Sequence, residues 1–474
     1  MNISDRVEAL YQGAILSIGN ISNMSFEEIT TGLSGWLWGF PLLILLLGGG
    51  LFFVFYSEFA PFKYFGHAIN VLRGKYDDPN DPGQINHFEA LSTALAATVG
   101  MGNVSGVAVA ITTGGPGAIF WMWVSAVIGI ATKFFTCSLA VMYRGKDSEG
   151  EVQGGPMYVI TEGLGKKWKP LATFFAVTGL IGALPIFQAN QFTQVIRDVL
   201  LVPNGVAGTN QTNLITGLVI TVVVSLVIFG GIKKIGKVAS KLVPTMVVLY
   251  FVVVAFIVIS NYQAILPSLT LIINDAFTGN AVLGGALGAI IIAGARRAAF
   301  SNEAGIGTAP MAHGAAKTTE PIREGLVAML GPFIDTIVVC TLTALAILVT
   351  GVWQGTESSG VTVTVNAFNT AIPGYGMYIL MLCVSIFAIT SLFSYSYYGT
   401  KCLSFMVGAK HKHYYNYFYV ASIVFGAAAS LTSIISLIDA AYALMSIPTM
   451  VSAIILAPKV KSAAKKYFAA LRMG

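Results

Sequence analysis

Charged residues are scarce in this chain. Asp, Glu, Lys and Arg make up only 10% of its 474 residues, whereas 55% are hydrophobic, and the mean hydropathy is +0.75. A soluble domain carries about 25% charged residues, so this composition excludes an ordinary soluble protein. It predicts an all-α polytopic protein in the lipid bilayer, because transmembrane helices satisfy their own backbone polar groups.

Cysteine is also scarce, and its spacing argues against two kinds of site. The four cysteines lie in separate apolar segments without a C-x-x-C or metal-ligand pattern. We therefore expect no disulfide and no cysteine-bound metal. The sequence shows no recognisable nucleophile–base pair either, which makes an enzyme the least favoured class. A channel would need rings of like side chains, which one chain of this pattern does not offer.

Stretches of about 20 apolar residues predict transmembrane helices. We expect about 11 of them, in a single transmembrane domain over 1–474. They lie near 36–56, 87–113, 116–143, 170–196, 213–231, 237–260, 279–314, 324–352, 375–399, 415–433 and 436–457. The stretch 57–76 mixes basic and aromatic residues and is predicted to be an interfacial helix.

Basic residues determine the expected orientation. If the chain crosses the membrane at each predicted span, 22 of the 27 Lys and Arg residues fall on one side. The positive-inside rule makes that side cytoplasmic. We therefore expect a multi-pass cell-membrane protein with its N-terminus outside and its C-terminus in the cytoplasm. The net charge of +6 reflects these loops, so we expect no nucleic-acid partner, and the sequence gives no sign of an obligate protein partner.

Glycines interrupt two predicted spans at matching places. The run Gly-Met-Gly-Asn at 100–103 lies in the second span, and Gly-Ile-Gly-Thr at 305–308 lies in the seventh. A Thr-Thr pair and a nearby proline follow each run at a similar distance. The second break lies five spans after the first, and this odd offset predicts an inverted five-plus-five repeat, 87–260 and 279–457, with one extra N-terminal span.

A helix that is broken inside the membrane exposes groups that can bind ligands. The second half begins with free N–H groups and a partial positive charge, and the first half ends with free carbonyls. The N–H groups near Gly102 and Asn103 suit a carboxylate, and the carbonyls from Ala97 to Gly100 suit Na⁺ or an ammonium group. The hydroxyls of Thr390 and Ser391 could complete a Na⁺ site or could bond only to their own helix.

Charged and polar groups inside predicted spans are further functional candidates. Arg296 and Glu303 lie seven residues apart on one helix face, and a break between them could bring them together. We expect them to join, with Arg297, in a structural or gating ion-pair network, and substrate contact is the alternative. Gln188 could line a binding pocket or simply bond to a neighbouring helix. In a proton-coupled carrier the titrating group would be Glu303 or Asp335.

Several segments together resemble the alanine or glycine:cation symporter family. They are Ala-Thr-Val-Gly-Met-Gly-Asn-Val-Ser-Gly at 97–106, Gly-Ala-Arg-Arg-Ala-Ala-Phe-Ser-Asn-Glu-Ala-Gly at 294–305, and Gly-Gly-Pro-Met-Tyr at 154–158. The resemblance runs across the chain from the second predicted span onward. Two positions depart from the pattern: Thr136 stands where an acid is usual, and Thr449 stands where Asn is usual. The second departure casts doubt on the last span as a polar contributor.

The resemblance implies a leucine-transporter-type fold and Na⁺-coupled import of a small neutral amino acid by alternating access. Alanine is the first expected substrate, with glycine as a possibility and a proton-coupled carrier as the alternative. The expected substrate site combines both breaks with the fourth span: Thr98, Gly100, Gly102, Asn103, Gln188, Phe300, Ser301 and Asn302. The expected Na⁺ site is Ala97, Gly100, Thr390 and Ser391.

Overall fold

The structure is a computed structural model that describes residues 25–277, 286–355 and 358–473. Part of the expected seventh span, 279–285, lies outside the described residues. The rest is almost entirely helical, with one short β-hairpin between β1 and β2. The predicted fold class, a helical membrane protein, is therefore confirmed.

The described elements follow in chain order. They are α2 (Phe26–Leu37), α3 (Phe40–Leu43), α4 (Gly49–Tyr56), α5 (Ala60–Lys63), α6 (Phe65–Leu72), α7 (His87–Thr98), α8 (Val107–Gly114), α9 (Gly117–Met142), β1 (Gly145–Lys146), β2 (Val152–Gln153), α10 (Pro156–Tyr158), α11 (Lys169–Gly182), α12 (Ile186–Val195), α13 (Asn210–Ile228), α14 (Gly231–Ser260), α15 (Tyr262–Ala276), α17 (Ala286–Asn302), α18 (Thr308–His313), α19 (Pro321–Ala328), α20 (Leu330–Pro332), α21 (Thr341–Thr350), α22 (Val361–Ala371), α23 (Gly376–Val407), α24 (Tyr414–Ala428) and α25 (Leu431–Met473).

Seven of the described helices are long and apolar enough to cross a membrane, and two bent helix pairs raise the number to nine. These nine overlap nine of the eleven predicted spans, and several extend beyond the predicted ends. The two remaining predictions, 279–314 and 415–433, correspond to α17 with α18 and to α24. The total of eleven therefore stays a prediction, as does the repeat.

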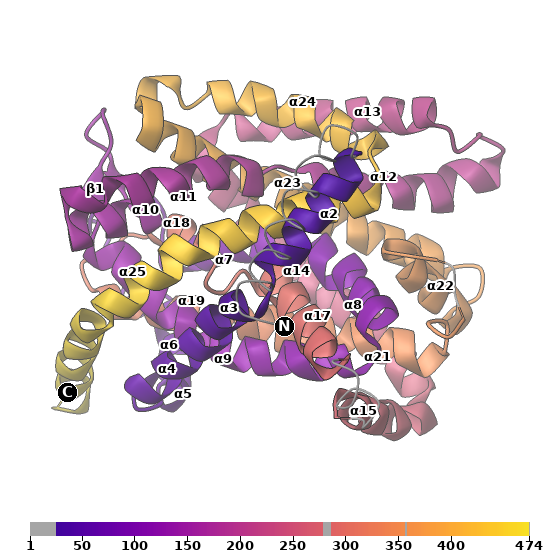
Figure 1. Cartoon of the computed structure of the whole chain (residues 1–474), viewed down its shortest axis with the longest axis horizontal. Helices are drawn as coiled ribbons and strands as arrows, with labels where there is room; N and C mark the ends of the chain where they lie inside the picture. The colour runs from indigo at the N-terminus through magenta and orange to yellow at the C-terminus, as the bar shows by residue number, and fades with distance from the viewer. Residues whose placement is uncertain (1–24, 278–285, 356–357, 474) are drawn as a thin grey trace, which may run out of the picture.

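The helices pack around the two broken ones. The long α25 runs across the molecule with α2 against it, and α13 lies beside α24 at one edge (Figure 1). Helix α9 contacts α17, α18 and α19 and so supports the second broken helix along its length. Large exposed apolar side chains on α13 and α14, such as Leu226 and Phe256, give these helices a surface suited to lipid.

Two helices lie where the sequence predicts only connecting segments. They are α15, which packs on α9 and α21, and α22, which packs on α21 and α23. Both are shorter than a membrane span, with 15 and 11 residues. A search for long apolar stretches therefore misses them.

Candidate substrate and cation site

The first broken helix consists of α7, a π-helical turn over Gly102–Gly106, and α8. Reciprocal bonds between Asn86 and Glu89 cap the start of α7. The helix ends at Thr98, because Val99 takes an extended conformation with ψ 90°. The two halves are bent by 50°. The Gly100 N–H donates to the side-chain oxygen of Asn103 at 2.8 Å, so a side chain replaces the missing helical partner.

The second broken helix consists of α17 and α18. Helix α17 ends at Asn302, and the next residues adopt left-handed backbone conformations: φ is 55° at Glu303, 85° at Gly305 and 106° at Gly307. The glycine run therefore marks the break correctly. Phe300, Ser301 and Asn302, which the sequence analysis expects in the substrate site, form the last turn of α17.

Asn103 joins the two breaks. Its amide nitrogen lies 3.2 Å from Ser301 Oγ in α17 and 2.7 Å from Asp335 Oδ1 in the π-helical segment Phe333–Cys340. Ser301 Oγ donates in turn to Asp335 Oδ2 at 2.5 Å. A Cβ on Gly102 would lie 3.3 Å from Phe300 Cδ1. The structure thus brings together the glycine, asparagine, serine and phenylalanine that the sequence selected from both breaks.

Asn302 faces the same segment from the neighbouring position. Its amide nitrogen donates to Thr336 Oγ1 at 3.0 Å, and its amide oxygen accepts from the Ala304 N–H at 3.0 Å. Both polar ends of this side chain are therefore used within the protein. Asn302 fixes the end of α17 in this state.

The opposite side of the first break faces α23. The position that a Cβ on Gly100 would occupy overlaps Ser391 Oγ and lies 3.7 Å from the Phe387 carbonyl oxygen. Ser391 and Thr390 each donate to the Phe387 carbonyl at 3.0 Å. A hydroxyl that donates its proton keeps lone pairs free. A hydroxyl and a backbone carbonyl oxygen of α23 therefore lie beside Gly100. Oxygens are the donor type that a hard monovalent cation prefers.

Two expected site residues carry unpaired polar atoms. Thr98 Oγ1 and Gln188 Oε1 are buried and have no hydrogen-bond partner among the residues that the structure describes. Burying an unpaired acceptor costs about 1–3 kcal/mol. Gln188 follows Phe187, whose ring lies 4.7 Å from the Phe300 ring in an edge-on arrangement, so α12 approaches the wall that Phe300 forms. Ala97 is also buried, in the last turn of α7.

Gln191 is a contact that the sequence analysis missed. Its side-chain oxygen accepts from Ser105, in the π-helical turn of the first break, and from the Val361 N–H at 3.0 Å. It thereby connects α12, the first break and the start of α22. No local signal distinguishes this glutamine from its polar neighbours along α12.

The expected pairing of Arg296 with Glu303 is wrong. Arg297 forms a buried ion pair with Asp439 of α25, and Arg296 lies 3.9 Å from the same carboxylate. Glu303 instead accepts hydrogen bonds from the hydroxyls of Thr308, Tyr395 and Tyr442. Residues seven positions apart lie on one face only where the helix is continuous, and α17 ends at Asn302, just before Glu303.

A cavity of about 500 Å³ opens beside the arginine pair. The polar residues around it are Thr112, Thr113, Arg296, Arg297, Ser359, Thr432, Ser436 and Asp439. The Arg297 guanidinium also lies 5.1 Å from the centre of the Phe300 ring. The ion pair therefore separates this cavity from the aromatic wall beside the first break.

Helix α25 does contribute a polar group to the second break, contrary to the doubt raised by Thr449. The Thr449 hydroxyl donates to the Ile306 carbonyl at 3.1 Å and to its own helix at 3.0 Å. Thr136, the other departure from the family pattern, bonds only to carbonyls of its own helix.

Comparison with known proteins identifies the family. The model of the sodium:alanine symporter family matches residues 23–474. The chain belongs to the sodium:alanine symporter family. An uncharacterized transporter of Haemophilus influenzae is 39% identical over 95% of this chain and 98% of its own. The sodium/alanine symporter AgcS of Methanococcus maripaludis is 38% identical over 94% of this chain and 98% of its own.

The family fold also agrees with a solved structure. The crystal structure of MhsT in complex with L-phenylalanine matches with a TM-score of 0.56 and 12% identity, over 81% of this chain and 98% of MhsT. At this identity the likeness concerns the fold alone. It supports the leucine-transporter-type architecture that the resemblance implied, and membership of the family makes this chain an amino-acid and sodium transport protein.

Proposed function

We propose that this chain is a Na⁺-coupled symporter that imports a small neutral amino acid, alanine first and glycine as a possibility, by alternating access. The observation that carries the proposal is the position of Gly100 between two different sets of polar groups. Its N–H side adjoins Asn103 and the restarted helix, and its other side adjoins Ser391 and the Phe387 carbonyl of α23.

The amino-acid carboxylate would bind at the start of the second half-helix. Free N–H groups and the positive end of the helix dipole favour an anion there. Gly102 supplies this backbone together with Asn103, whose N–H donates to the Gly100 carbonyl at 3.1 Å in this structure. Phe300 and Ser301 form the facing wall, and the buried Thr98 hydroxyl, which has no partner among the described residues, can donate to a carboxylate. The close approach of Gly102 to the Phe300 ring favours a substrate with a small side chain.

The cation would bind on the α23 side of the same break. Carbonyl oxygens from Ala97 to Gly100 and the hydroxyls of Thr390 and Ser391 are the proposed ligands. All of them are hard oxygen donors, which suit Na⁺. Because substrate and cation would share one broken helix, binding of either would order the backbone that the other needs, which couples the two.

The proposed cycle moves the two broken helices relative to the rest. An inverted repeat of 87–260 and 279–457 would allow such rocking about a central site. The proposed orientation places the N-terminus outside and the basic loops in the cytoplasm.

Uptake of labelled alanine into proteoliposomes tests the function directly. We expect saturable, concentrative uptake with an inward Na⁺ gradient, unchanged by a protonophore, and no such uptake in protein-free liposomes. Uptake that needs no Na⁺ and collapses with the protonophore would instead establish a proton-coupled carrier.

The proton-coupled carrier remains the second candidate because of Asp335. This carboxyl group is fully buried where the two breaks meet, within hydrogen-bond distance of Asn103 and Ser301. Its position gives it access to both broken helices. The same uptake experiment distinguishes the two candidates.

A further inference from the structure

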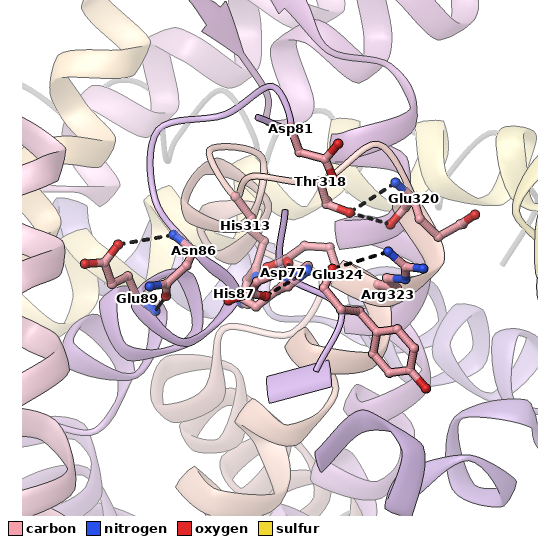
Figure 2. Close-up of polar contacts among 12 residues, drawn as sticks. Asp77, Asp81, Asn86, His87, Glu89, His313, Thr318, Glu320, Arg323 and Glu324 are labelled. Carbon is pink, nitrogen blue, oxygen red and sulfur yellow. Dashed lines mark hydrogen bonds and ion pairs between the residues drawn. The ribbon is translucent and has the colours of Figure 1, made fainter. Parts of the chain in front are cut away.

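A buried carboxylate lies between two buried histidines at the end of the molecule that carries the basic loops. His87 Nδ1 contacts one oxygen of Glu324, and His313 Nδ1 lies 2.5 Å from the other. All three side chains have an exposed fraction of 0%. Figure 2 shows them converging from separate elements.

This cluster connects the two broken helices. His87 is the first residue of α7, His313 is the last residue of α18, and Glu324 lies in α19. Glu324 therefore holds one half of the first broken helix and one half of the second. It touches neither the proposed substrate site nor the proposed cation site, so it is a positioning residue.

The backbone beside the cluster is joined in the same way. The Gln84 N–H donates to the Ala315 carbonyl at 2.7 Å, and the Lys317 N–H donates to the Ile85 carbonyl at 2.6 Å. Arg144, which follows α9, donates to the Gly314 and Thr318 carbonyls at 2.9 and 2.8 Å. The segment before α7 and the segment after α18 thus form one hydrogen-bonded layer.

The hydrogen bonds define the protons of the cluster. Carboxylate oxygens only accept, so both histidines donate from Nδ1. The two Nε2 atoms have no hydrogen-bond partner among the described residues. His87 Nε2, however, lies 3.9 Å from Asp77 Oδ1. A nitrogen facing a carboxylate is stable as N–H⁺, so this geometry favours a charged His87 between Asp77 and Glu324.

We propose that Glu324, His87 and His313 form a proton-dependent clasp that holds this end of α7 and α18 together, and that loss of the His87 proton releases it. The clasp regulates the opening through which substrate leaves, and in that sense it rests on the proposed function. A buried carboxylate is stable only with a compensating charge. When His87 becomes neutral, Glu324 loses that charge and Asp77 faces a lone pair.

Other charged or titratable groups also face the cluster. From the surrounding elements these are Asp77, Cys137, Arg144 and Arg323. Arg323 opposes a charge on His87, whereas Asp77 and Glu324 favour it. Only histidine ordinarily titrates between about pH 5 and pH 8, which points to His87 as the group that responds.

A third histidine provides a matched control. His67, in α6, lies close to Arg323 but outside the cluster, and its Nε2 lies 2.7 Å from the Tyr467 hydroxyl. Burial, followed by the charges of Arg323 and Lys75, lowers the pKa of His67. His67→Gln removes this titration and leaves the clasp intact.

Amide hydrogen exchange of the full-length protein in lipid nanodiscs tests the clasp. Exchange of peptides covering 84–98 and 313–319 is measured at about pH 6 and about pH 8.5. Peptides from α13 and α24, which lie outside the cluster, provide the reference that corrects these rates for the intrinsic pH dependence of amide exchange. We expect exchange at the higher pH to be about tenfold faster or more, because hydrogen bonds to a charged group are lost. Equal protection at both pH values would overturn the proposal.

The variants separate protonation from packing. His87→Asn keeps a neutral donor near the Nδ1 position but cannot be charged, so exchange should become independent of pH, whereas His67→Gln should keep the wild-type response. Glu324→Gln should exchange fast at both pH values. If this variant does not fold, His313→Asn retains a donor to Glu324 and should keep the response. A full pH response in His87→Asn would contradict the clasp.

The exchange experiment needs no transport, so the two proposals can fail separately. Alanine uptake without the pH-dependent exchange would reject the clasp and leave the symporter intact. The pH-dependent exchange without Na⁺-driven uptake would support the clasp in a carrier of another coupling type.

Discussion

The two broken helices both use glycine, but for different physical reasons. In the first break, Gly100 and Gly102 do not have a positive φ. Close neighbours matter there instead: a Cβ on Gly100 would overlap Ser391 Oγ, and a Cβ on Gly102 would make a tight contact of 3.3 Å with Phe300 Cδ1. In the second break, Gly305 and Gly307 have φ of 85° and 106°, which other residues rarely adopt.

This difference separates the tasks of the two breaks. The first brings bare backbone close to hydroxyl, carbonyl and aromatic groups of other helices, which is what a ligand site requires. The second redirects the chain, and Glu303, with its own φ of 55°, is held there by three hydroxyl donors. In the proposed function the first break therefore supplies the binding groups, and the second supplies the frame that faces them.

The largest effect is expected at the second break, from Gly307→Ala. The left-handed backbone costs about 1–2 kcal/mol with a Cβ, and overpacking adds about 1–3 kcal/mol. The new Cβ would lie 2.5 Å from Thr449 Oγ1 and 2.6 Å from Phe175 Cε2. We expect a marked loss of stability, measured by thermal unfolding in detergent.

Gly351→Ala is the matched control for this change. Gly351 has φ of 70° with nothing within 4 Å of its Cβ position, so it has the backbone strain without the overlap. Gly351→Ala should therefore lower the thermal stability less than Gly307→Ala does. Equal losses in the two variants would mean that close packing at Gly307 contributes nothing.

Gly100→Ala should act on transport more than on stability. The added methyl group overlaps Ser391 Oγ and separates the first break from α23. We expect Na⁺-driven alanine uptake to fall to background, whereas Gly106→Ala, with nothing within 4 Å, should retain it. The double variant Gly100→Ala with Ser391→Ala makes room for the methyl group and should recover thermal stability but not Na⁺ dependence. Normal uptake by Gly100→Ala would rule out a ligand site at this contact.

The sequence predicts this division only in part. Apolar length locates nine of the described spans or bent pairs, and glycine spacing locates both breaks, because both signals are local. The pairing of Arg296 with Glu303 fails because the prediction extends helical periodicity through a break. Once the chain turns at Glu303, only the folded structure shows that Asp439, from α25, reaches the arginines.

The His87–Glu324–His313 cluster could not be predicted from the sequence, for a related reason. Its members come from three elements, and none of them lies in a recognisable motif. Their contact depends on how α7, α18 and α19 meet, which no periodicity encodes. Asn103 with Ser301 is easier to anticipate, since each residue adjoins a visible glycine break.

A smaller and more selective effect is expected when Thr390→Ala is combined with Ser391→Ala. The change removes two hydroxyl ligands from the proposed cation site and leaves the backbone of the first break in place. The Na⁺ concentration for half-maximal uptake should rise about tenfold or more, since one charge-assisted contact contributes about 1.5–3 kcal/mol, and the corresponding alanine concentration should change far less. Ser385→Ala, in the same helix, is the control, because Ser385 bonds to its own helix at 2.6 Å. An unchanged Na⁺ dependence in the double variant would remove the cation from this side of the break.

The smallest effect is expected from Phe300→Leu, which tests whether the second broken helix limits substrate size. Phe300 packs against Phe187 and faces Gly102, so a shorter side chain enlarges the space at the first break without removing a hydrogen bond, although it also removes the ring that faces the Arg297 guanidinium. One methylene in an apolar pocket changes discrimination by about 1–3 kcal/mol. Wild-type protein should therefore take up leucine much less well than alanine, and the variant should narrow that ratio by several-fold with its Na⁺ dependence unchanged. The ratio of the two uptake efficiencies, measured in competition, decides the point. If the variant still takes up alanine and its ratio of leucine to alanine uptake equals that of the wild type, Phe300 does not limit substrate size. The groups of the first break would then select the substrate without it.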